Sequence, residues 1–165
     1  MAISVFHLFS IGIGPSSSHT VGPMRAARKF VLHLQNENIL NKIHSIKVDL
    51  YGSLALTGKG HATDLAILLG LEGQSPENVD PNLAPIQVEQ IRSRQLLNLL
   101  GIHQIHFEES SQLIFHYDKQ LPYHPNGMRF TVYDSNHKEL KSEVFYSVGG
   151  GFIVDHKEAK KDGHI

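Results

Sequence analysis

The sequence has 165 residues, a net charge of −1, twelve histidines and no cysteine. This length suits one domain with its own core, and the near-neutral charge without a basic stretch argues against nucleic-acid or membrane-surface binding. No signal-peptide pattern and no apolar run near the roughly 20 residues of a membrane span are present, so a cytoplasmic protein is expected.

The first half of the chain predicts mainly helices. Residues 1–11 alternate loosely and indicate a helical turn or a short strand. Residues 23–36 carry apolar side chains at i, i+3 and i+7, which predicts an amphipathic helix. Residues 46–51 alternate as a half-buried strand does. Residues 65–69 predict a short apolar helix that stops at Gly70.

The second half of the chain predicts mainly strands. Residues 71–85 contain three prolines and are expected to form a long surface connection, whereas residues 88–100 predict a second long helix ended by Gly101. Period-two patterns follow, and they predict four strands around residues 105–107, 113–117, 128–132 and 144–148, with a hairpin turn at 134–137.

Helices early and strands late, without a steady βαβ alternation, predict an α+β fold. We expect a mostly antiparallel sheet with helices packed on one face, in a single domain covering residues 3–154. Residues 155–165 are charged and poor in apolar side chains, which favours a frayed tail or the start of a linker.

A serine-rich stretch, residues 12–23, precedes the first predicted helix. It contains Ser16, Ser17, Ser18, His19 and Thr20, followed by Gly22-Pro23, and proline is favoured in a first helical turn. Hydroxyl and N–H groups at a helix N-terminus suit an anion. The stretch therefore predicts an anion site, and the alternative is that Ser18 or Thr20 simply caps the helix.

His61 is a candidate general base. It lies in a glycine-rich turn that opens the helix at 65–69, where the helix dipole disfavours imidazolium and keeps the ring neutral. The alternative is an ordinary surface histidine. Gly58-Lys59-Gly60 beside it lacks the spacing of a nucleotide-binding P-loop.

Two further groups of histidines allow other interpretations. His124 and Asn126 share a loop constrained by two prolines and a glycine, and such residues face a ligand, face an interface or only form a turn. His103, His106 and His116 could form a metal site if they face one side of adjacent strands, although no standard zinc motif is present.

Four separated segments of the sequence match a known family in the family's order, and they are Ile3 to Met24, Tyr51 to Asp64, His124 to Met128 and Tyr146 to Ile153. Through these motifs the sequence resembles the N-terminal β domain, or allosteric substrate-binding domain, of single-chain bacterial iron–sulfur L-serine dehydratases.

The resemblance implies conversion of L-serine to pyruvate and ammonia. It implies catalytic roles for His61, as base, and for His19, with the substrate carboxylate bound by Ser16, Ser17, Ser18 and Thr20. It also implies regulatory or interface roles for His124, Asn126 and Ser147. An L-serine-binding domain of this type is expected to form a homodimer and to contact a catalytic α domain.

The family's α domain, which carries the cysteines for a [4Fe–4S] cluster, is not in this sequence. The chain is therefore expected to be an excised domain or a separate β subunit, inactive alone and without a cofactor or metal of its own. Two alternatives stay open, namely a free-standing module that senses serine or another small anion, and a histidine-based metalloenzyme.

Overall fold

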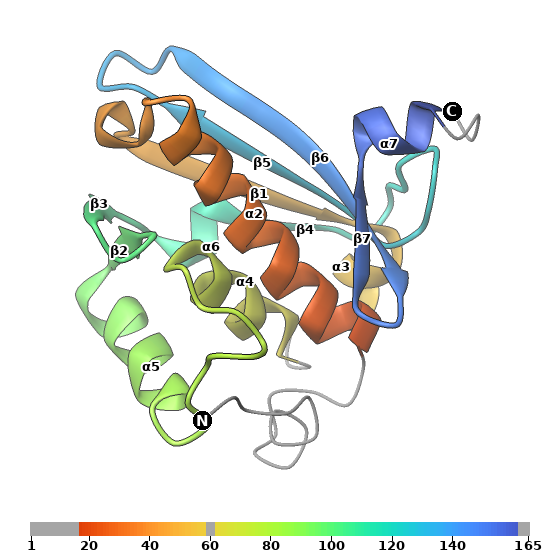
Figure 1. Ribbon diagram of the computed structural model, residues 1–165, viewed down its shortest axis with the longest axis horizontal. Coiled ribbons are helices and arrows are strands. Elements are labelled where there is room, and N and C mark those ends of the chain that lie inside the picture. The colour runs from red at the N-terminus through yellow and green to blue at the C-terminus, as the bar shows by residue number, and fades with distance from the viewer. Residues whose placement is uncertain (1–16, 59–61, 162–165) are drawn as a thin grey trace.

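The computed structural model describes residues 17–58 and 62–161 (Figure 1). The expectation for residues 1–11 therefore lies outside the described residues. The described elements are η1 (Ser17–Val21), α2 (Gly22–Asn36), η2 (Leu40–Lys42), β1 (Ser45–Tyr51), α3 (Gly52–Gly58), α4 (Thr63–Leu71), α5 (Ala84–Arg94), β2 (Leu96–Leu99), β3 (His103–His106), α6 (Glu109–Gln112), β4 (Leu113–His116), β5 (Gly127–Tyr133), β6 (Glu139–Gly149), β7 (Phe152–Asp155) and α7 (His156–Lys161).

A five-stranded sheet in the order β4-β1-β5-β6-β7 forms the centre of the fold. Only the β1–β4 pair is parallel among the described strands of this sheet, and the other three pairs are antiparallel. The turn at 134–137 joins β5 to β6 as predicted, with the side chain of Asp134 accepting from the amides of Asn136 and Lys138. The structure confirms an α+β fold with a mostly antiparallel sheet.

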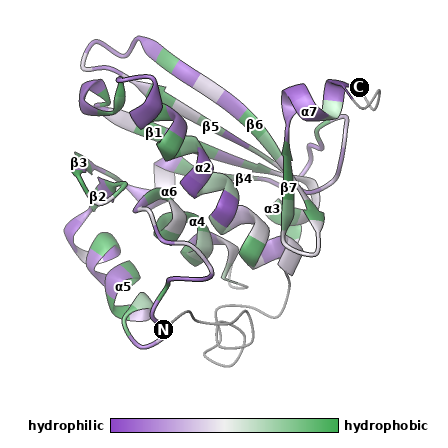
Figure 2. Ribbon diagram, viewed as in Figure 1, coloured by the Kyte–Doolittle hydropathy of each residue, from purple (hydrophilic) through white to green (hydrophobic). Residues whose placement is uncertain are grey.

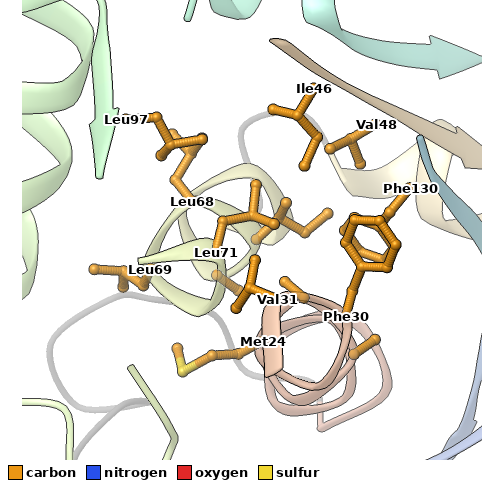
Figure 3. Packing of buried hydrophobic residues seen from close by; sticks show 14 of the residues in the cluster. Met24, Phe30, Val31, Ile46, Val48, Leu68, Leu69, Leu71, Leu97 and Phe130 are labelled. Atoms are coloured by element: carbon orange, nitrogen blue, oxygen red, sulfur yellow. The ribbon is translucent and has the colours of Figure 1, made fainter. Parts of the chain in front are cut away.

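The core lies between this sheet and the helices α2 and α4. Figure 3 shows Met24, Phe30 and Val31 of α2 and Leu68, Leu69 and Leu71 of α4, together with Ile46, Val48 and Phe130 of the sheet, all of them buried. Along α2, hydrophilic and hydrophobic residues alternate between its faces (Figure 2), as the helical periodicity predicts. Within the described ranges, no helix is both long enough and apolar enough to cross a membrane.

The expected helix over residues 88–100 is correct only up to Arg94. Helix α5 ends at Arg94 because Gln95 takes a left-handed conformation with φ of 54°. Residues 96–99 then form β2, which pairs antiparallel with β3 and buries Leu97 and Leu99. A short leucine-rich run fits either periodicity, and the pairing with residues 103–106 decided between them.

Residues 155–165, expected to be a frayed tail or the start of a linker, include a short helix. Residues 156–161 form α7, and Ala159 on this helix is fully buried. Asp155 and Glu158 cap its start reciprocally, since the amide of Glu158 donates to Asp155 Oδ1 (2.8 Å) and the amide of Asp155 to Glu158 Oε1 (3.3 Å). This is the arrangement of a capping box, with aspartate in the first position.

Candidate functional site

The described part of the serine-rich stretch is helical. Ser17–Val21 form one π-helical turn that runs directly into α2, and Thr20 and Val21 are buried. Short π-helical segments widen a helix locally and are frequent at functional sites. Here the turn contacts both α4 and β6, so it is held by two other elements.

His19 is fixed from three sides. Its Nδ1 atom lies 2.9 Å from Ser18 Oγ, and its Nε2 atom lies 3.1 Å from Ser53 Oγ at the start of α3. Its backbone carbonyl accepts a hydrogen bond from Thr63 Oγ1 (2.5 Å) at the start of α4. A hydroxyl can donate or accept a hydrogen bond, so Ser18 and Ser53 between them engage both ring nitrogens of His19.

The start of α3 is built against the loop that contains His124. Gly52 has a φ of 56°, and a Cβ atom there would overlap the carbonyl oxygen of Pro125, so only glycine fits. The next amide, that of Ser53, donates to the same carbonyl at 2.9 Å. The loop is therefore joined by a backbone hydrogen bond to Ser53, whose hydroxyl contacts His19.

Asn126 and Ser147 are held together. The amide of Ser147 donates to the Asn126 carbonyl (3.0 Å), and Asn126 Nδ2 donates to the Ser147 carbonyl (3.1 Å). The Ser147 side chain in turn lies against the first residue of α2, since a Cβ atom on Gly22 would overlap Ser147 Oγ. The residues expected to be regulatory thus adjoin the serine-rich stretch rather than forming a distant cluster.

Three buried oxygen atoms of this region have no hydrogen-bond partner among the described residues, and they are Thr20 Oγ1, Asn126 Oδ1 and Ser147 Oγ. Thr20 and Ser147 are fully buried, and Asn126 is 8% exposed. An unsatisfied buried polar group costs about 1–3 kcal/mol, so such atoms are candidates for ligand contacts.

The alternative that Thr20 only caps α2 is not supported, since the N-cap of α2 is Val21 and no side chain caps it.

Ser16 and His61 lie outside the described residues. The described chain resumes at Ala62, which has a φ of 72°, and continues into the buried Thr63. Because Thr63 bonds the His19 carbonyl, the start of α4 adjoins the serine-rich stretch.

The three histidines of the metal alternative are separated. His103 and His106 lie on β3 in the two-stranded sheet, whereas His116 lies on β4 of the main sheet. His103 Nε2 donates to the Ile43 carbonyl (2.7 Å), and His116 Nε2 lies 2.7 Å from Asp49 Oδ1. The expectation that they face one side of adjacent strands is wrong, and the described residues contain no group of three His, Asp or Glu side chains placed to hold a metal ion.

Neither Ser53 nor Thr63 is among the site residues that the resemblance implies. A usable signal existed, because both lie in the motif from Tyr51 to Asp64 that resembles the dehydratases. The motif does not show which residue Ser53 or Thr63 contacts. Ser53 meets His19 across 34 positions and Thr63 across 44.

His124 is expected to make the stability of the protein depend on pH. Burial lowers the pKa of its imidazole below the ordinary value of 6.5. In addition, the amide of Asn126 donates to Nδ1 at 3.0 Å, which requires an unprotonated nitrogen. Below about pH 6.5 the unfolded chain binds this proton more readily than the folded one, so the free energy of unfolding falls as the pH falls.

We therefore expect His124→Gln to flatten the decline in unfolding free energy between about pH 7.5 and pH 5. Urea denaturation at a series of pH values measures it. His156→Gln is the matched control, because His156 is exposed on α7. Equal pH profiles for the His124 variant and the wild type would contradict the expectation.

Together, the fold and this cluster define an α+β domain that presents an oriented histidine and several hydroxyl groups at the start of α2. The family model of the serine dehydratase beta chain matches residues 4–158. The chain therefore belongs to the serine dehydratase beta chain family, and the resemblance inferred from the four motifs is confirmed.

Several curated relatives are similar over nearly the whole chain. The L-serine dehydratase of Streptomyces coelicolor is 56% identical over 94% of this chain, and the L-serine dehydratase TdcG of Escherichia coli is 51% identical over 93%. The L-serine dehydratase of Helicobacter pylori is 38% identical over 99%. The chain spans only 34%, 34% and 36% of these three proteins, about a third of their length.

Proposed function

We propose that this chain is the substrate-binding and regulatory β domain of an L-serine dehydratase, a lyase that converts L-serine to pyruvate and ammonia together with a catalytic α domain. The observation that carries the proposal is the oriented His19 ring, bonded to Ser18 and Ser53 beside the start of α2. Family membership supports the reaction, because the similar proteins are named L-serine dehydratases.

In this proposal the serine carboxylate binds at the serine-rich stretch. The hydroxyls of Ser16, Ser17 and Thr20 donate hydrogen bonds to it, and His19 and Ser18 do so by exchanging their mutual hydrogen bond for the carboxylate. The N–H groups of the first helical turn favour its negative charge. The buried and unpartnered Thr20 Oγ1 supports this role among the described atoms.

His61 is proposed to take the α-proton. Loss of that proton and of the β-hydroxyl as water gives aminoacrylate, which tautomerises to an imine, and hydrolysis of the imine releases pyruvate and ammonia. The bond from Thr63 to the His19 carbonyl supports this assignment, since it fixes a residue two positions after His61 against the proposed carboxylate site. A neutral imidazole is a suitable base near neutral pH.

We further propose that His124, Asn126 and Ser147 transmit regulation or form a contact with another domain, and that the β domain forms a homodimer in the cytoplasm. The regulatory role is supported by the contacts of these residues with the start of α2 and with Ser53. Asn126 is bonded to Ser147, Ser147 lies against Gly22 at the start of α2, and Pro125 is bonded to the partner of His19.

The iron–sulfur cluster that the resemblance implies does not fit the residues of this chain. The sequence has no cysteine, and thiolates are the usual ligands of such clusters. We propose that the cluster is ligated by the α domain. The roles assigned to this chain are therefore limited to binding, orientation and proton transfer.

The test is to assay pyruvate formation from L-serine with the purified chain alone and after mixing it with a catalytic α domain. We expect no turnover from the chain alone and turnover from the mixture. Pyruvate formation by the chain alone would contradict the division of roles. Saturable L-serine binding to the chain by calorimetry, without turnover in the mixture, would favour a free-standing serine-sensing module.

A further inference from the structure

The structure assigns a positioning role to Ser53. We propose that its hydroxyl orients the His19 imidazole for substrate binding, and that its amide couples this orientation to the loop of residues 122–127. The proposal rests on the proposed function of His19 as a carboxylate-binding residue. None of the roles implied by the resemblance includes Ser53.

Both the backbone amide and the side-chain hydroxyl of Ser53 contact other parts of the fold. Its amide donates to the Pro125 carbonyl (2.9 Å), and its Oγ lies 3.1 Å from His19 Nε2. The preceding amide, that of Gly52, donates to the Lys119 carbonyl at 2.7 Å. The end of β1 and the start of α3 thus form a backbone support that holds the Ser53 hydroxyl at one place.

Ser53 differs from Ser18, which also contacts the His19 ring, in what it can fix. Ser18 is adjacent to His19 within the same π-helical turn, so their bond orients the ring relative to that turn. Ser53 comes from a different helix, 34 positions away. Its hydroxyl therefore links the direction of the imidazole to the start of α3, which the bond to Ser18 does not do.

The same residue links His19 to the loop proposed to be regulatory. The Pro125 carbonyl that accepts from the Ser53 amide lies between His124 and Asn126 in the chain. A Cβ atom at position 52 would overlap this carbonyl, so the loop packs directly against the start of α3. A rearrangement of the loop would therefore change the position of Ser53 and, through its hydroxyl, the orientation of the His19 ring.

The experiment compares kinetics of the assembled enzyme, this chain with its α domain, for Ser53→Ala, His19→Ala and the double variant. We expect Ser53→Ala to lower kcat/KM for L-serine about tenfold, because a misplaced binding group loses much of its effect. The loss should appear mainly in KM. Ser53→Thr keeps the hydroxyl and should restore most of the activity, and Ser93→Ala, an exposed serine on α5, is the control.

The double variant separates positioning from general damage to the fold. If Ser53 acts through His19, Ser53→Ala adds no further loss once His19 is alanine. A loss that persists in full in the His19→Ala background overturns the proposal. The proposal is also overturned if kcat/KM of the Ser53→Ala enzyme lies within twofold of the wild-type value while that of His19→Ala is reduced. In that case the proposed function of His19 stands. If His19→Ala is itself unimpaired, the proposed carboxylate role fails and the positioning role fails with it.

Discussion

Replacing His19 with alanine is expected to lower kcat/KM of the assembled enzyme for L-serine by about 100-fold, the usual loss when one oriented donor at a charged group is removed. The ring is held at both nitrogens by Ser18 and Ser53, so wild-type His19 loses little conformational entropy on adopting its binding orientation. Steady-state assays of pyruvate formation over a range of L-serine concentrations measure the change.

Folding should be affected far less, because the bond from Thr63 goes to the His19 backbone carbonyl and survives the substitution. His19→Gln, which places an amide near the position of Nε2, should recover part of the loss. His156→Ala, on the exposed surface of α7, is the control. A His19→Ala enzyme with wild-type kcat/KM would remove this histidine from the site.

Replacing Phe130 with alanine is expected to destabilise the chain by about 3–5 kcal/mol, the typical cost of truncating a buried phenylalanine. Phe130 is fully buried in β5. Its ring stacks on Phe30 of α2 at 5.3 Å (Figure 3). It also meets the Phe145 ring of β6 edge-on at 5.9 Å. The substitution therefore opens a cavity where the helix layer and two strands meet.

Urea denaturation of the chain measures this loss as a lower midpoint. Phe152→Ala is a matched control, because the same side chain is 70% exposed on β7. We expect it to change the unfolding free energy by no more than about 0.5 kcal/mol. Similar midpoints for the two variants would mean that the contact between α2 and β5 contributes little to stability.

The sequence predicted most of the fold because its local signals and tertiary contacts agree. The apolar spacing of α2 matches the face that packs on α4 and the sheet. In β1 the apolar residues Ile46, Val48 and Leu50 are buried as predicted, but Asp49 and Tyr51 are buried as well. Where a run fits two periodicities, as in residues 96–99, the signal failed. Pairing with β3 turned that run into a strand.

For the site, the sequence alone determined which residues to examine, and residue type together with four ordered motifs was enough to identify the family. It did not determine which of them meet. The bonds from His19 to Ser53 and to Thr63, and the contact of Ser147 with Gly22, join positions far apart in the chain. Such contacts arise only when α3, α4 and β6 pack around the start of α2, and no local pattern encodes that packing.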